Sequence, residues 1–102
     1  MPYVDETLRV SLDPKINDLV AELRTLADQS KGEATEGITN YAITRILIGV
    51  FGENRQTHKR SYKLFNAAVG VMGCVVLELY RCMVAPYEDV KKKENGDVYP
   101  IY

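Results

Sequence analysis

An uncharged, mostly apolar run of 14 residues, Leu64 to Leu77, lies past the middle of this chain. More than any other feature, it limits the folds that the chain can adopt. The run belongs to a helix predicted from residue 61 to residue 85, which spans roughly 37 Å at 1.5 Å per residue and which Pro86 should end. Between Ala67 and Leu77 no side chain is charged or strongly polar, so apolar surface faces every direction. Such a helix must be covered on all sides.

The rest of the chain offers too few and too short helices for that. We therefore predict a homo-oligomer whose interface includes this third helix, where small residues let another helix approach closely: Asn66, Gly70, Gly73 and Cys74. The alternative is a monomer in which the N-terminal segment and the C-terminal tail wrap the helix. No membrane span is expected, because 14 apolar residues fall short of the roughly 20 that cross a bilayer.

The first predicted helix covers residues 14–28. Asp13 is its N-cap and Pro14 its first helical residue, where the missing N–H of proline is no loss. Apolar residues then recur at the spacing of one helical face: Ile16, Leu19, Val20, Leu23, Leu26 and Ala27. This helix is therefore amphipathic, with one side in water.

A polar loop over residues 29–37 leads to a second predicted helix over residues 38–51, in which Arg45 is the only charged residue. A buried strand from Ile46 to Phe51 is the alternative for its end, because β-branched residues favour strands. The tail, residues 86–102, contains a turn signal at Asn95-Gly96 and then apolar residues that we expect to dock: Val98, Tyr99, Ile101 and Tyr102.

Together these elements predict one all-α domain over residues 1–102. Its architecture is an amphipathic first helix, then an antiparallel helical hairpin with a long central third helix, with the tail docked and the chain homo-oligomeric. A length of 102 residues with 46% hydrophobic and 26% charged content suits a single globular domain.

Charge and cysteine content narrow the functional classes. Thirteen basic and fourteen acidic residues give a net charge of −1, which argues against a polybasic protein that binds long nucleic acids. Cys74 and Cys82 lie about two turns apart on one predicted helix and cannot pair, which fits a reducing compartment. The N-terminal residues do not resemble a signal peptide, so we expect a cytoplasmic protein.

The usual signatures of catalysis and of metal or cofactor binding are absent. The sequence has no glycine-rich phosphate loop, no zinc-protease motif and no CxxC pair. Its single histidine, His58, lies in a polar loop with no cysteine nearby, which is typical of a solvated side chain. We therefore predict that the protein is not an enzyme and uses no cofactor or metal.

Short charge runs occur at two places, and both are typical of solvated surface. Residues 53–63 carry Arg55, Lys59, Arg60 and Lys63 against a single acidic residue, Glu53. The tail carries three consecutive lysines, residues 91–93, flanked by acidic residues. Residues 1–40 are by contrast acidic, with eight acidic and four basic side chains.

Arg45 and Arg81 are more informative, because each interrupts an apolar helix, where a charge is usually paired or functional. Arg81 has Glu78 three residues earlier, so a salt bridge within the helix is its alternative role. Arg45 has no acidic residue within one turn, and its alternative is pairing with the first helix or with another subunit.

Polar and aromatic neighbours complete a candidate ligand-binding set. Asn40, Tyr41 and Thr44 lie beside Arg45, and Tyr80 precedes Arg81. Guanidinium groups bind phosphate through paired hydrogen bonds, and tyrosine rings stack on bases. Arg45 and Arg81 would contact phosphates, and Tyr41 or Tyr80 would stack on bases. Asn40 and Thr44 would supply hydrogen bonds.

Several short, mostly polar segments of the chain resemble those of a family of small helical phage and prophage proteins of unknown function. The matching segments are Pro2-Tyr3, Asn40-Tyr41 with Ile43-Thr44-Arg45, Glu78 to Arg81, Pro86 to Glu88, and Asn95 to Tyr99. A more distant resemblance, over Arg81, Val84, Pro86 and Glu88, is to the helical hairpin of phage anti-CBASS proteins and the related Thoeris-blocking sponges. Those proteins sequester cyclic nucleotide signals of bacterial immunity.

The resemblance implies a phage-encoded oligomer that binds and sequesters a small anionic signal, a cyclic oligonucleotide, in pockets between subunits and without catalysis. Two other functions remain open. One is an oligomeric scaffold or protein-interaction module without a small-molecule ligand, which would use the tail and the basic residues 55–63. The other is a nucleic-acid accessory factor, which the net charge disfavours.

Overall fold

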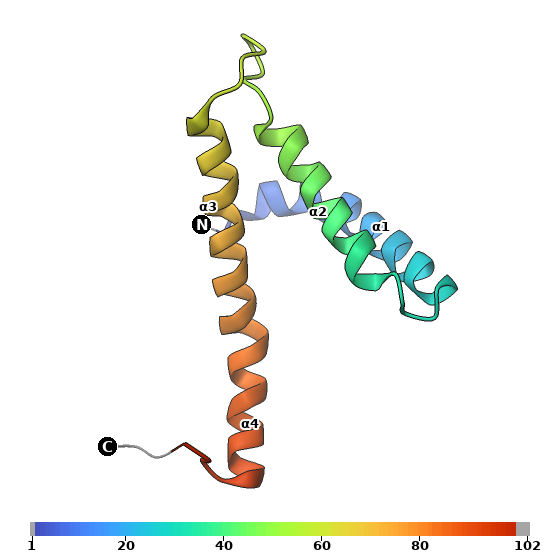
Figure 1. Ribbon diagram of the computed structural model, residues 1–102, viewed down its shortest axis with the longest axis vertical. Helices are drawn as coiled ribbons and strands as arrows, with labels where there is room; N and C mark the ends of the chain where they lie inside the picture. Colours follow the sequence, from blue (N-terminus) through green and yellow to red (C-terminus); the bar gives the residue numbers. More distant parts are fainter. Residues whose placement is uncertain (1, 100–102) are drawn as a thin grey trace. The chain divides into compact units, whose positions relative to one another are not determined.

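The computed structural model describes residues 2–99, and its regular structure is helical (Figure 1). The elements are α1 (Glu6–Gln29), α2 (Thr35–Phe51), α3 (Tyr62–Leu79), the short π-helix η1 (Tyr80–Val84) and α4 (Ala85–Asn95). No strand occurs in residues 2–99, so the all-α prediction is confirmed and the strand alternative for Ile46–Phe51 is excluded.

The chain divides into two units, Met1–Ile48 and Gly49–Tyr102. The first contains α1 and most of α2, which a turn over residues 30–34 connects. The second contains the end of α2, a loop and the helix formed by α3, η1 and α4. The single domain over residues 1–102 and the hairpin of the second and third helices stay predictions.

Helix α1 begins at Glu6, eight residues before the predicted start, and Pro14 lies inside it. Asp5 is the N-cap, and its carboxylate accepts a hydrogen bond of 3.0 Å from the Leu8 N–H. Asp5 and Glu6 mark the start of the helix: Asp5 accepts a free N–H group of the first turn, and the negative charge of Glu6 suits the positive end of the helix dipole. Assigning the start to Asp13 and Pro14 was therefore wrong.

Replacing Pro14 by alanine should stabilise α1, because proline inside a helix has no N–H for the carbonyl four residues earlier and its ring crowds that carbonyl. We expect Pro14→Ala to raise the free energy of unfolding by about 2 kcal/mol, measured by urea denaturation. Ser11→Ala in the same helix is the control and should change it by less than about 1 kcal/mol. No gain for Pro14→Ala would show that the helix starts at Pro14 or later.

Helix α2 begins at Thr35, three residues before the predicted position, because the connection from α1 is tighter than its composition indicated. Gly32, with a φ of +84°, donates its N–H to the Ala27 carbonyl at 2.8 Å and so closes the end of α1. The left-handed residue of this helix-ending arrangement is Lys31, with a φ of +56°, whose N–H donates to the Asp28 carbonyl at 3.0 Å; glycine is the usual residue at that position. The helix ends at Phe51, where the sequence placed its end.

The third helix continues past Pro86. Residues Tyr62–Asn95 form one helix of 34 residues, visible in Figure 1 as the unbroken ribbon from α3 to α4. Ser61 caps its start by accepting the Leu64 N–H at 3.3 Å. Just before the proline the helix widens into η1, and the Ala85 N–H bonds to the Tyr80 carbonyl five residues back. A π-turn of this kind relieves the clash of a proline ring with the preceding turn.

The predicted tail over residues 86–102 is therefore helical up to Asn95, which corrects its assignment as a non-helical segment. Gly96, with a φ of +79°, ends α4 at the predicted turn. Val98 and Tyr99 are exposed, while the predicted docking residues Ile101 and Tyr102 lie outside the described residues. Tail docking stays a prediction.

The most consequential property of the fold is that no residue in the range 2–99 is buried. Apolar side chains along the long helix are exposed, including Val69, Val76, Leu77, Leu79 and Met83. Within its own unit the helix has no second helix to pack against. By length and composition alone, residues Tyr62–Asn95 also suffice to cross a membrane, with a mean hydropathy of 1.7 over the most apolar window.

Candidate functional site

Arg45 and Tyr41 form the best-defined part of the candidate site. They lie one turn apart on α2, and Nη1 of Arg45 donates a hydrogen bond of 2.8 Å to the Tyr41 hydroxyl. The guanidinium carbon lies 5.7 Å from the centre of the tyrosine ring, within range of a cation–π attraction. Tyr41 is 63% exposed, so its ring is open to a ligand.

Arg45 has no carboxylate partner among residues 2–99. Its predicted alternative role, pairing with an acidic residue of the first helix, is therefore not seen within the described chain, while pairing with another subunit stays open. A guanidinium held by a neutral hydroxyl keeps its full charge and further N–H donors. This arrangement leaves Arg45 able to bind an anion.

Asn40 and Thr44 lie on the same stretch of α2 and bond to each other. The Thr44 hydroxyl donates to the Asn40 side-chain oxygen at 3.2 Å. The Asn40 amide N–H₂ group and the Thr44 hydroxyl oxygen remain suitable for a ligand. The structure thus brings together four of the six predicted site residues on one exposed stretch of helix, Asn40, Tyr41, Thr44 and Arg45.

The other two predicted residues, Tyr80 and Arg81, lie in η1, which belongs to the other unit of the chain. Arg81 pairs with Glu78 through a short contact between the guanidinium and the carboxylate, as its alternative role predicts. The same Glu78 oxygen accepts the Cys82 thiol at 3.0 Å. Arg81 is therefore partly neutralised within its own helix, which leaves it less charge to offer a ligand than Arg45.

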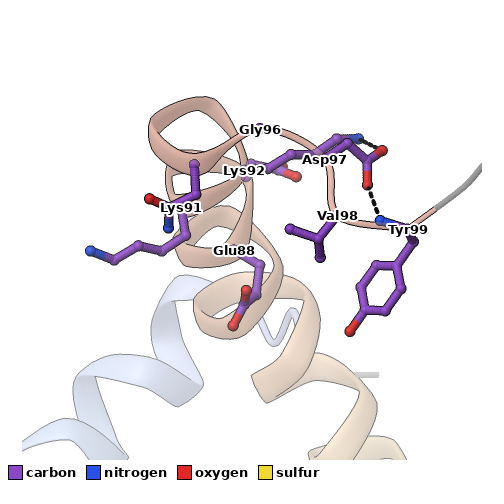
Figure 2. A pocket seen from close by; sticks show the side chains of 9 residues that line it. Glu88, Lys91, Lys92, Gly96, Asp97, Val98 and Tyr99 are labelled. Atoms are coloured by element: carbon purple, nitrogen blue, oxygen red, sulfur yellow. Dashed lines mark hydrogen bonds and ion pairs between the residues drawn. The ribbon is translucent and has the colours of Figure 1, made fainter.

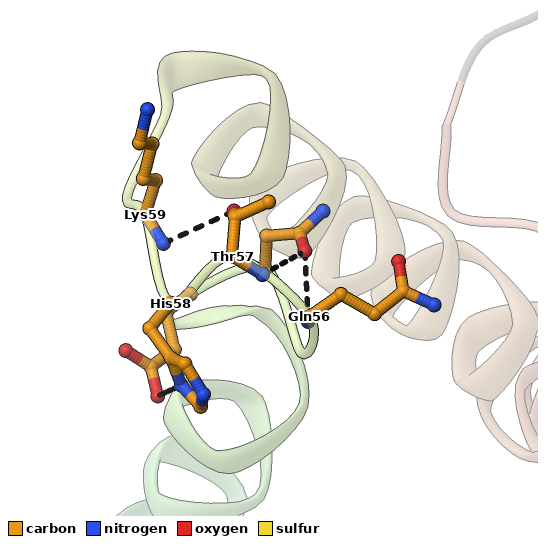
Figure 3. Close-up of polar contacts among 6 residues, drawn as sticks. Gln56, Thr57, His58 and Lys59 are labelled. Atoms are coloured by element: carbon orange, nitrogen blue, oxygen red, sulfur yellow. Dashed lines mark hydrogen bonds and ion pairs between the residues drawn. The ribbon is translucent and has the colours of Figure 1, made fainter.

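The loop between α2 and α3 is organised by Asn54, a residue that the sequence analysis did not single out. Its side-chain oxygen accepts the N–H groups of Gln56 and Thr57, both at 2.9 Å (Figure 3). Asparagine is well suited to such a turn because its short side chain reaches the backbone two and three residues on. His58 is exposed and contacts Glu53 at 3.2 Å, consistent with a loop histidine.

A surface pocket of about 250 Å³ lies between the last turns of α4 and residues 96–99. Figure 2 shows the two contacts that shape it: Lys92 pairs with Asp97 at 3.3 Å, and the Tyr99 N–H donates to Asp97 at 3.1 Å. These two contacts lower the pKa of Asp97, with the Tyr99 hydrogen bond the larger cause and Lys92 the next. The turn at Asn95-Gly96 was predicted from the sequence, whereas this pocket was not.

This turn should open in acid. Because the pKa of folded Asp97 lies below its ordinary value of 3.8, the contribution of its carboxylate to the turn is complete above pH 3.8. That contribution is lost as the pH falls further, through the lowered pKa. The Tyr99 amide resonance, followed by NMR during acid titration, should report a midpoint below 3.8. Lys92→Met should leave it below 3.8, since the Tyr99 bond is the larger cause; a return to 3.8 would contradict that order.

No group of three or more histidine, cysteine or acidic side chains suited to a metal ion occurs in the part of the chain that the structure describes.

Comparison with known proteins gives one match. A family model described as a domain of unknown function (DUF6899) matches residues 1–98. No curated protein and no solved structure matches the chain.

Proposed function

We propose that this chain, which belongs to the family described as a domain of unknown function (DUF6899), is a homo-oligomer that acts by binding rather than by catalysis. In this proposal other copies of the chain cover the helices that one copy leaves exposed. The protein works in the cytoplasm as a helical assembly.

One observation carries this proposal: α3 is uncharged from Leu64 to Leu77, and yet none of its residues is buried. Burying a leucine or valine side chain stabilises a protein by about 1.5–3 kcal/mol, and leaving it in water forfeits that gain. A soluble monomer rarely exposes so large a contiguous apolar surface. A second copy supplies an equally apolar helix of the same length.

Glu78 and Arg81 favour a protein partner over a lipid bilayer as the cover of this helix. The uncharged run Leu64–Leu77 is 14 residues long, so a span of roughly 20 residues would have to take in Lys63 at one end or the Glu78–Arg81 ion pair at the other. Charged side chains are costly in the hydrocarbon of a bilayer and rare unless they face a protein interior or a water-filled cavity. In a water-soluble assembly the same pair lies at the edge of an interface and stays hydrated.

The thermal unfolding midpoint of such an assembly should depend on protein concentration, because dilution favours dissociation and dissociation exposes the apolar helices. We expect the midpoint to rise by several degrees over a hundredfold increase in concentration, followed by circular dichroism at 222 nm. A midpoint that stays constant over that range would mean that each chain unfolds alone.

A second candidate function, sequestration of a small anionic nucleotide, is favoured by Arg45. Its charge has no carboxylate partner among residues 2–99, and an exposed tyrosine ring lies beside it. Phosphate binding by guanidinium and base stacking by tyrosine together suit a nucleotide. In this proposal the protein is a phage-encoded anti-defence factor, the nucleotide is a cyclic oligonucleotide, and the oligomer supplies pockets between subunits.

Sequestration without turnover has a direct test. The protein is incubated with an excess of a cyclic dinucleotide or a cyclic trinucleotide, the bound fraction is separated, and the protein is heat-denatured. Chromatography should then recover the nucleotide chemically unchanged. Recovery of a linear or shortened nucleotide would contradict sequestration and indicate an enzyme, whereas an empty bound fraction would leave the homo-oligomer as the function.

A further inference from the structure

We propose that a second copy of the chain packs antiparallel against one face of α3, so that Tyr80 of each copy fills the space over Gly70 of the other and Leu77 fills the space over Gly73. This inference rests on the homo-oligomer proposed above and specifies how two copies meet. It follows from the sizes of the side chains along one face of the helix and from where its charges lie.

The face is defined by residues that alternate at spacings of three and four. These are Lys63, Asn66, Gly70, Gly73, Leu77 and Tyr80, which we call the heptad face. Residues at this spacing form a single seam along a helix and meet the same seam on a neighbouring helix in a coiled coil. All six are exposed, as a free seam requires.

Side-chain size changes sharply along the heptad face. After Lys63 its first part is small, with Asn66, Gly70 and Gly73, and no atom outside the local helix lies within 4 Å of the place where a Cβ would stand on Gly70 or Gly73. Its second half is large and unpacked, with Leu77 71% exposed and Tyr80 56% exposed. One half of the seam therefore has space to be filled, and the other half has side chains to fill it.

One antiparallel register satisfies both halves at once. If the twofold axis passes at residue 75, Tyr80 lies opposite Gly70 of the second copy and Leu77 lies opposite Gly73. Each large residue then meets a glycine, and symmetry repeats both pairings. A parallel pair in register would instead place glycine on glycine, which leaves voids, and Tyr80 on Tyr80, which crowds the seam.

The charges favour the same direction. Lys59 and Arg60 lie in the loop just before the long helix, and Lys63 lies in its first turn. None of the three forms an ion pair within residues 2–99, and neither do Glu88 and Asp89 near the other end of the helix. Antiparallel packing about residue 75 brings Lys63 to the level of residues 87 and 88 in the second copy. Parallel packing would place the basic ends side by side, where like charges repel.

Disulfide trapping tests the register. The two native cysteines are first replaced by serine, and Gly70→Cys and Tyr80→Cys are then introduced, singly and together. In the proposed pair, residue 70 of one copy is opposite residue 80 of the other. Two residues 70 of a pair are about 15 Å apart along the axis, as are two residues 80. A disulfide needs Cα atoms within about 7 Å, so the double variant should form oxidised dimers and neither single variant should.

The outcomes separate the orientation from the assembly itself. An internal disulfide in the double variant is excluded, because residues 70 and 80 of one helix are about 15 Å apart. Dimers from both single variants would show parallel packing and overturn the proposal while keeping the homo-oligomer. If light scattering shows that the reduced wild-type protein is a monomer, the homo-oligomer is overturned and this inference with it.

A spin-label measurement leaves Gly70 and Tyr80 untouched. In Cys74→Ser protein, a nitroxide attached to Cys82 should have its counterpart about 21 Å away along the axis of an antiparallel pair centred on residue 75. Parallel packing in register would give no axial separation. A pulsed-EPR distance distribution centred above about 20 Å supports the proposal, and a distribution confined to much shorter distances overturns it.

Discussion

Replacing Leu77 by aspartate should dissociate the protein and lower its unfolding midpoint by at least about 12 °C. The substitution removes about 1.5–3 kcal/mol of apolar burial and adds a carboxylate that cannot be buried unpaired. For a chain of this size 1 kcal/mol corresponds to about 4–8 °C in the midpoint, so a loss of about 3 kcal/mol gives that decrease. Circular dichroism and light scattering measure the two effects on the same sample.

Asn17→Asp is the matched control, because it also places a new aspartate on an exposed helical position and changes the net charge by the same amount. It should leave the mass unchanged and shift the midpoint by no more than a few degrees, as surface substitutions usually do. Equal effects of the two substitutions would mean that Leu77 is as solvated in the working protein as Asn17 is. That result would remove α3 from any interface.

Under the sequestration proposal, the bound nucleotide should stabilise the protein strongly, and Arg45→Ala should remove most of that stabilisation. Ligand at about 100 times its Kd adds roughly 2.7 kcal/mol, which corresponds to a rise of about 11–22 °C in the midpoint. Loss of a charge-assisted contact worth about 2.7 kcal/mol weakens binding about a hundredfold. The same ligand concentration then adds only about 0.4 kcal/mol. A thermal-shift panel of cyclic dinucleotides, cyclic trinucleotides and ADP-ribose-derived signals makes the measurement.

Arg24→Ala on α1 is the control for loss of a cation and should retain the full ligand shift. Tyr41→Phe should have an intermediate effect, because it keeps the ring and removes the hydroxyl that holds Arg45. Absence of a shift with every compound would contradict the sequestration proposal. If Arg45→Ala instead dissociates the oligomer, Arg45 pairs with another subunit and does not bind a ligand.

The helix boundaries were predicted correctly where the pattern of neighbouring residues decides them. They were predicted wrongly at the two prolines. The apolar run places the start of α3 to within one residue, because the pattern depends only on neighbouring residues. Pro14 and Pro86 were both assigned to helix ends and both lie within helical segments. In the first case an earlier cap at Asp5 begins the helix, and in the second a π-turn accommodates the ring, which no propensity rule anticipates.

In the candidate site, contacts within one helix could be predicted from the sequence, and contacts in the loops could not. Contacts three or four residues apart on one helix, such as Arg45 with Tyr41 and Arg81 with Glu78, follow from helical geometry. The pocket beside Asp97 and the loop organised by Asn54 were missed, because both depend on how the backbone turns after a helix ends. A search for asparagine and aspartate beside helix ends would have pointed to both.

The mass of the protein in detergent-free buffer shows directly whether copies of the chain cover the long helix. Size-exclusion chromatography with multi-angle light scattering should give a mass of at least twice the 11.5 kDa of one chain, without added lipid. A stably folded species of 11.5 kDa would contradict the homo-oligomer, because one chain would then cover its own apolar helix. A protein that stays dispersed only in detergent would contradict it equally, because lipid would then be the partner of the long helix.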